Sequence, residues 1–222
     1  MENKVTVLYY SANVENEAFE RSIMDNIMKQ KGDLPLISVT QKPTDFGDNI
    51  CVGKQRCCYF NEFRQIQIGL KFCKTPYVLT AEADCLYPPE YFKYDPKEED
   101  IVYRYGNVWV HYINHYKPCF RYKGFSDGSQ LISRDLWLQK IEEALSPYPN
   151  IEWLKEGDES PKLLAQFGTD HSHTWAGDPV VTFKTTAGVS QRTQLSKRKE
   201  PTETLPYWGE INKLRKDYHI IQ

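Results

Sequence analysis

No stretch of this 222-residue sequence stays apolar over the roughly 20 residues that a membrane-spanning helix needs. The first thirty residues mix charged and apolar side chains without an apolar core segment, so we expect no signal peptide. The sequence also has no Asn-X-Ser/Thr acceptor for N-glycosylation. These absences favour a cytoplasmic protein without a membrane span.

The six cysteines lack the paired spacing of a zinc or redox motif. Cys57 and Cys58 are adjacent and cannot readily bond to each other. The interpretation that follows is six reduced thiols, as is typical of a cytoplasmic protein.

The net charge is also small, at −2, because the sequence has 28 basic and 30 acidic residues. No overall field therefore draws the chain to nucleic acid. One basic cluster, Lys197-Arg198-Lys199, lies in a polar segment, where it is either a solvated loop or a clamp over phosphates.

Aromatic residues, in contrast, are abundant, with 15 Tyr, 10 Phe and 5 Trp. Tyr and Trp join a flat apolar face to a polar edge, which suits the stacking of sugars and bases but serves a protein core equally well. Composition alone leaves both uses open.

The first half of the chain alternates strand and helix patterns. Short β-rich runs end in polar loops, and longer segments repeat apolar residues at helical spacing. The pattern predicts strands at 5–10, 35–40 and 77–81 and helices at 17–31 and 59–73, with a loop over 41–58. Such alternation is typical of a parallel α/β sheet.

The second half has a different pattern. Residues 101–122 alternate aromatic, β-branched and polar side chains, which predicts antiparallel strands. Further expected elements are a turn at 125–130, helices at 135–145 and 161–167, a strand at 180–184, a mobile basic segment at 187–203 and a last helix from Pro206. We expect a single α/β domain, 1–222, with a mixed sheet flanked by helices.

Two carboxylates, Glu82 and Asp84, follow the predicted strand 77–81 and precede a double proline. Side chains two apart on a strand point the same way, so both can reach one point beyond the strand. Hard oxygen ligands suit Mg²⁺ or Mn²⁺, the ions that accompany phosphates. The pair predicts a metal-bridged diphosphate, although such carboxylates also occur at ordinary strand exits.

Two other loops are expected at the same edge, because open α/β sheets bind ligands beyond the carboxyl ends of their strands. Ser11 and Asn13 follow the first predicted strand, and Thr40 to Lys42 follow the second. Three loops converging on one edge strengthen the prediction of a site.

The pattern over 4–92, with Glu82-Ala83-Asp84 as a variant of the Asp-X-Asp motif, resembles the GT-A-type glycosyltransferases. Similarity is weaker over 124–145, and Leu205-Pro-Tyr-Trp-Gly209 resembles small phage and bacterial proteins of this type. The resemblance implies a Rossmann-like nucleotide-sugar half (4–92), an acceptor half (93–186) and a basic loop with a C-terminal helix (187–222).

The resemblance also implies roles for individual residues. The nucleotide-sugar, most simply a UDP-sugar, would contact Glu82 and the residues Ser11, Asn13, Gln41, Lys42, Asn61 and Arg64. Asp84, with Glu82, would bind Mn²⁺ or Mg²⁺, and the family's frequent late histidine would be His171 or His173.

A catalytic base is implied if the reaction inverts configuration. Asp127 in the Ser-Asp-Gly turn and Asp158 or Glu159 are the candidates. Asp127 before Gly128 also fits a plain turn, and His171 and His173 also fit exposed or hydrogen-bonded imidazoles.

The sequence therefore predicts a metal-assisted glycosyltransferase whose acceptor is a glycan, a small molecule or a hydroxylated DNA base. A nucleotidyltransferase would use the same edge, but Tyr10 to Glu15 lacks the Gly-rich basic loop of such enzymes. A non-catalytic sugar- or nucleic-acid-binding module is the alternative of a different class.

Overall fold

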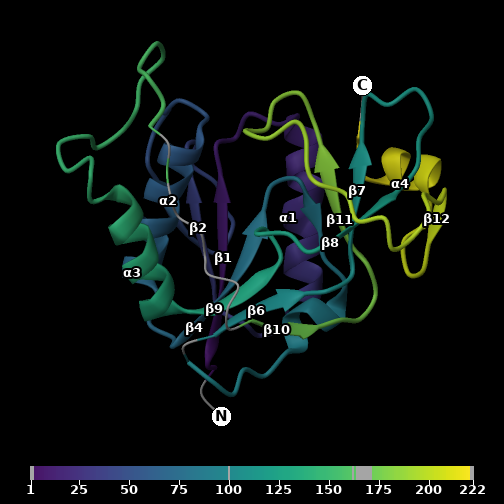
Figure 1. Ribbon diagram of the computed structural model, residues 1–222, viewed down its shortest axis with the longest axis horizontal. Coiled ribbons are helices and arrows are strands. Elements are labelled where there is room, and N and C mark those ends of the chain that lie inside the picture. The colour runs from purple at the N-terminus through teal and green to yellow at the C-terminus, as the bar shows by residue number, and fades with distance from the viewer. Residues whose placement is uncertain (1–2, 100, 162, 164–171, 221–222) are drawn as a thin grey trace.

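The structure is a computed structural model that describes residues 3–99, 101–161, 163 and 172–220. Within these residues a seven-stranded sheet has the strand order β10-β6-β9-β4-β1-β2-β3 (Figure 1). Its strands are β1 (Val5–Ser11), β2 (Leu36–Thr40), β3 (Asp48–Cys51), β4 (Tyr77–Glu82), β6 (Val102–Tyr105), β9 (Gln130–Ser133) and β10 (Ser172–Trp175). The neighbours β4, β1, β2 and β3 are parallel, whereas β9 runs antiparallel to both β4 and β6. The predicted α/β architecture with a mixed sheet is confirmed.

The two faces of this sheet bury alternate residues of each strand, as the pleat requires. On β1, Leu8 and Tyr10 belong to the core under α2 (Tyr59–Phe72) and α3 (Arg134–Leu145). Gly69 lets α2 approach this face closely, because a Cβ there would lie 2.3 Å from Leu8.

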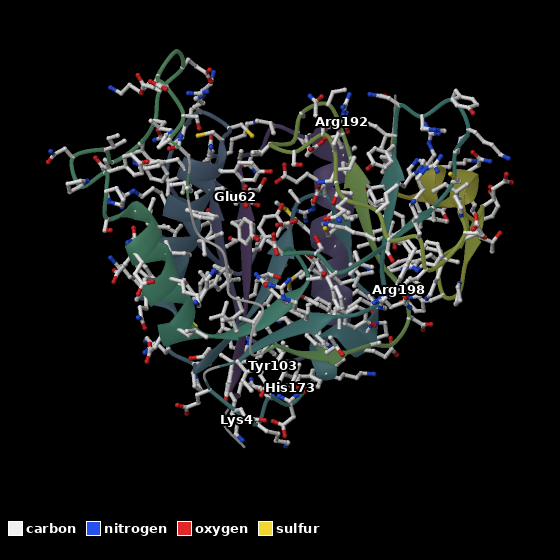
Figure 2. All side chains as sticks on the ribbon, in the orientation of Figure 1. Lys4, Glu62, Tyr103, His173, Arg192 and Arg198 are labelled. Atoms are coloured by element: carbon white, nitrogen blue, oxygen red, sulfur yellow. The ribbon has the colours of Figure 1, made fainter. Side chains whose placement is uncertain are left out.

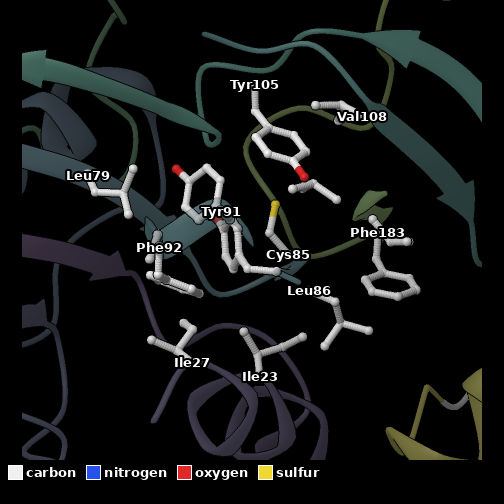
Figure 3. Packing of buried hydrophobic residues seen from close by; sticks show 14 of the residues in the cluster. Ile23, Ile27, Leu79, Cys85, Leu86, Tyr91, Phe92, Tyr105, Val108 and Phe183 are labelled. Carbon is white, nitrogen blue, oxygen red and sulfur yellow. The ribbon is translucent and has the colours of Figure 1, made fainter. Parts of the chain in front are cut away.

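Val7 and Tyr9 face the opposite core, which is covered by α1 (Glu17–Gln30). A second sheet, β5-β11-β7-β8, completes that core. Its strands are β5 (Cys85–Leu86), β7 (Val108–Tyr112), β8 (Arg121–Gly124) and β11 (Val180–Lys184). Figure 3 shows Ile23 and Ile27 of α1 packed below Leu86, Tyr91 and Phe92.

Three short elements complete the described fold. A 3₁₀ helix spans Pro89–Lys93 and begins at the second residue of the double proline, and a small hairpin of β12 (Thr204–Leu205) and β13 (Gly209–Glu210) leads into α4 (Ile211–Asp217). No helix in the described ranges is long and apolar enough to cross a membrane.

The sequence-based expectations were wrong at three elements. The 41–58 loop contains β3, which pairs with β2 although its side chains are largely exposed. The last helix begins at Ile211 and not at Pro206, because positive φ angles at Tyr207 and Gly209 turn the chain into the hairpin. Strands within 101–122 are not purely antiparallel, since β6 and β7 also have the parallel partners β10 and β11. The helix expected at 161–167 lies mostly outside the described residues.

Candidate functional site

A cavity of about 430 Å³ lies where β1, β2 and β4 end, which is the edge where an open α/β sheet binds ligands. Its walls also come from the start of α2, the end of β11, the 126–128 turn and the segment 188–194. Figure 2 shows Glu62 of α2 and Arg192 of this segment in the upper part of the molecule. The charged side chains of the wall are Glu15, Arg56, Glu62, Glu82, Asp84, Lys123, Asp127, Lys184 and Arg192.

Glu82 and Asp84 are brought together as the sequence predicts, and donor atoms of Glu82, Asp84 and Cys85 all lie within 4.8 Å of one another. Glu82 Oε1 accepts a hydrogen bond of 2.9 Å from the Tyr10 hydroxyl on the neighbouring strand. The oxygen-rich donor set fits a divalent ion.

Tyr87 fixes the strand end that carries these carboxylates. Its hydroxyl accepts from the Glu82 backbone N–H at 3.0 Å and donates to the Gly128 carbonyl at 2.6 Å. The turn at 126–128 therefore lies directly over Glu82, and it brings Asp127 into the same cavity.

A third carboxylate, Glu62, joins the pair from the first turn of α2. Burial, followed by the charges of Glu82 and Asp84, raises the Glu62 pKa to about 8. Burial and then Asp84 raise the Glu82 pKa to about 7. Carboxylates buried close together repel one another, which favours their protonated forms. A cation that binds at the site would therefore displace protons from Glu62 and Glu82.

Sequence reasoning missed Glu62, although a signal existed. Tyr59, Glu62 and Gln65 recur every third residue on α2, and all three line the cavity. Gln65 Nε2 donates to the carbonyls of Ser11 and Val39 at 2.9 Å, which fixes this helix face over the strand ends.

The raised pKa values predict an unusual pH dependence of stability. The unfolded chain ionises Glu62 near its ordinary value of 4.5, whereas the folded protein keeps the proton up to about pH 8. Stability of the metal-free protein should therefore fall as pH rises from about 5 to 8, because the unfolded state then binds fewer protons. Glu62→Gln should raise the unfolding temperature by about 2 to 4 °C at pH 8.5 and change it little at pH 5. Thermal denaturation at both pH values checks this, and an equal effect at both would contradict it.

Basic side chains line the same cavity as the carboxylates. Lys184 is the last residue of β11. Burial lowers the pKa of its ammonium group, but the charges of Asp84 and Glu82 outweigh this effect and raise the pKa above its ordinary value, so the group stays charged. Lys123 and Arg192 add positive charge to the same wall. The sequence offered a signal for Lys184, since it is the last residue of the predicted strand 180–184. The basic cluster Lys197-Arg198-Lys199 is not part of the cavity wall.

The segment after β11 is tied to the loop after β1. Glu15 Oε1 accepts from the Thr185 hydroxyl at 2.6 Å, and Thr185 Oγ1 accepts from the backbone N–H of Gly188 at 3.1 Å. Burial raises the Glu15 pKa to about 7, against the lowering effect of the Thr185 hydrogen bond. These contacts hold the start of the 188–194 segment against the loop after β1.

Gln41 offers the cavity a hydrogen-bond donor. Its side chain is buried, its Oε1 accepts from the Gln55 backbone N–H at 2.7 Å, and its Nε2 has no partner among the described residues. Asn13 fixes the backbone at Gln41, because Asn13 Oδ1 accepts hydrogen bonds from the backbone N–H groups of Gln41 and Lys42 at 2.8 and 2.9 Å. A ligand carbonyl would satisfy the free amide N–H.

Several residues expected at the site lie outside the cavity wall. Asn13 and Lys42 only flank it, and Asn61 exchanges hydrogen bonds with the backbone of Leu154. Arg64 donates to the Ile151 carbonyl at 2.6 Å. Asn61 and Arg64 thus hold the 151–154 segment against α2.

The expected base Asp158 and the expected ligand His173 are also placed elsewhere. Asp158 is exposed and accepts from the Lys155 backbone N–H. His173, on the edge strand β10, lies 3.6 Å from Glu98 Oε1 and beside Tyr103, far from Glu62 (Figure 2). His173 and Asp84 are therefore not brought to one metal, and His171 lies outside the described residues.

The sequence matches no protein-family profile and no curated protein. Among solved structures, the chain is similar to Staphylococcus aureus TarS (residues 1–349), with 12% identity over 82% of this chain and 61% of that one and a TM-score of 0.47. It is similar to mannosyltransferase PcManGT from Pyrobaculum calidifontis in complex with GDP-Man and Mn²⁺, with 15% identity, coverage of 84% and 58%, and a TM-score of 0.44.

The catalytic domain of Drosophila β1,4-galactosyltransferase 7 is similar at 14% identity, with coverage of 63% of this chain and 52% of that one and a TM-score of 0.39. This chain thus spans about half the length of that domain. Bifunctional IspDF from Campylobacter jejuni also matches, so the similar structures are not all named as glycosyltransferases. These similarities are low.

Proposed function

We propose that this protein is a glycosyltransferase that moves a sugar from a nucleoside-diphosphate sugar to an acceptor hydroxyl with the help of a divalent ion. The observation that carries the proposal is the pairing of Glu82 and Asp84 at the end of the central strand β4, in one cavity with Lys184. A volume of about 430 Å³ falls within the range of small-ligand sites.

Glu82 and Asp84 would hold the ion, since both carboxylates lie on the cavity wall. Bound there, a divalent ion would neutralise the diphosphate that leaves when the sugar bond breaks. Lys184 and Arg192 would contact phosphate oxygens as charge-assisted donors. Positive groups already in place at the leaving group favour the transition state over the bound substrate.

The nucleoside would occupy the side of the cavity formed by Ser11 and Gln41. The free Nε2 of Gln41 would donate to a carbonyl of the base. We assign this contact to position 4, where uracil presents a carbonyl and cytosine presents an amino group, so that it favours UDP over CDP.

Asp127 is the candidate base for the acceptor hydroxyl, because its turn brings it to the wall that also carries Glu82. An acceptor placed between Asp127 and the sugar would lose its proton as the new bond forms. The exposed Asp158 has no comparable position. The identity of the acceptor, including a modified DNA base, stays a prediction from the sequence.

Calorimetric titration of UDP tests this proposal directly. Binding in the presence of Mn²⁺, its loss in EDTA and weaker binding of CDP are the expected results. Binding that is unaffected by EDTA would contradict the metal-assisted mechanism. With a UDP-sugar and a suitable acceptor, release of UDP is expected, whereas release of pyrophosphate from a nucleoside triphosphate would identify a nucleotidyltransferase.

A further inference from the structure

Cys85 lies directly behind the two carboxylates of the proposed metal site. Its Sγ is 3.4 Å from Asp84 Oδ1 and 3.8 Å from Glu82 Oε2. The residue is fully buried, and Figure 3 shows it in the packed cluster near Tyr91 and Tyr105. In the metal-free protein the thiol is placed to donate a weak hydrogen bond to both acids.

The spacing of these three donors suits a single ion. The sulfur and carboxylate atoms lie within 4.8 Å of one another. Zinc bonds of about 2.3 Å to sulfur and about 2.0 to 2.2 Å to carboxylate oxygen span such a triangle after small side-chain shifts. Among the described residues, this is the one such cluster of three or more His, Cys, Asp or Glu donors.

The surroundings point to a ligand at this place. Glu82 and Asp84 of this cluster line the cavity that also holds the charged Lys184, and the buried Cys85 lies behind them. Cys57 also lines the cavity, but it is not part of this cluster, and its Sγ lies 3.8 Å from the Ala187 carbonyl.

We propose that Cys85 is a third protein ligand of the divalent ion, so that the site prefers thiophilic ions such as Zn²⁺ and Co²⁺ to Mg²⁺. The inference rests on the proposed function, because it uses the same metal site. As the sulfur–metal bond forms, the thiol S–H bond breaks and its proton passes to solvent. Thiolate is a soft ligand, and adding it to two carboxylates changes which ion binds most tightly.

Titration of the metal-free protein with Co²⁺ tests this ligand directly, because a thiolate on cobalt produces an intense near-ultraviolet charge-transfer absorption. The band is expected in the wild type and in Cys73→Ser, whose cysteine is also buried but precedes β4. It should be absent in Cys85→Ser. That variant should also lose at least about tenfold in Zn²⁺ affinity while its Mn²⁺ affinity changes by less than about threefold.

Each outcome separates this inference from the proposed function. Metal-dependent UDP binding with no sulfur–cobalt band would overturn the role of Cys85 alone. A band that survives in Cys85→Ser would likewise overturn it. Absence of any metal binding by the wild type would sink both. If Cys85→Ser does not fold, X-ray absorption of the wild type with one equivalent of Zn²⁺ decides, since one sulfur in the coordination shell is expected and none would refute the proposal.

Discussion

Asp84→Asn is expected to abolish metal-dependent binding of UDP and to lower the rate of sugar transfer by at least about a hundredfold. Asparagine keeps the shape of the side chain but removes the negative charge that holds the ion beside the diphosphate. The proposed reaction places that ion at the leaving group, where its charge matters most in the transition state. Calorimetry with Mn²⁺ and a transfer assay measure the two effects.

The matched control is Asp25→Asn on α1, because that carboxylate is exposed and pairs only with Arg21 in the described ion pairs. This variant should bind UDP and Mn²⁺ as the wild type does. If Asp84→Asn still bound UDP in a manner sensitive to EDTA, the ion would have to lie elsewhere.

Gly128→Ala is expected to weaken Mn²⁺ binding by at least about tenfold, although residue 128 is not a ligand. A Cβ at this position would lie 2.1 Å from Glu82 Oε2 and 2.4 Å from its carboxyl carbon. The turn cannot easily retreat, because the Gly128 carbonyl accepts from Tyr87 at 2.6 Å. The Glu82 carboxylate would therefore have to rotate away from Asp84. Calorimetric titration of Mn²⁺ measures the loss.

Gly106→Ala provides the comparison for this variant, because a Cβ at residue 106 would meet its nearest neighbour, a Phe125 ring atom, at an ordinary 3.7 Å. It should leave Mn²⁺ affinity unchanged. Wild-type affinity in Gly128→Ala, with an unchanged unfolding temperature, would show that the position of Glu82 is not critical for the ion.

The cavity encloses several carboxylates together with a lysine ammonium group. Glu62, Glu82 and Asp84 repel one another, and the raised pKa values of Glu62 and Glu82 reflect that repulsion together with burial. Lys184 offsets part of it. A bound cation would relieve the remainder, so ion binding should also stabilise the fold.

Local sequence determined the framework of the site. The runs at β1, β2 and β4 are mostly apolar, with a few Ser and Thr residues, because those strands are buried on both faces, and such runs are recognisable without a structure. The two-residue spacing of Glu82, the last residue of β4, and Asp84, just beyond it, then sufficed to predict a pair of carboxylates at the sheet edge. The apolar spacing of α1 likewise gave its bounds almost to the residue.

Long-range contacts decided the rest. Tyr10 and Glu82 are 72 residues apart in sequence yet share a hydrogen bond, and Lys184 reaches the same wall from a strand of the other sheet. A local sequence pattern carries no information about contacts between residues so far apart in the chain. For the same reason the sequence predicted Asn61, Arg64 and His173 at a site that they do not line. Sequence periodicity tells which way a side chain faces within its own element, whereas the packing of elements against one another sets which charges meet. Burial of those charges together, and hence their pKa values and affinity for a cation, arises only in the tertiary structure.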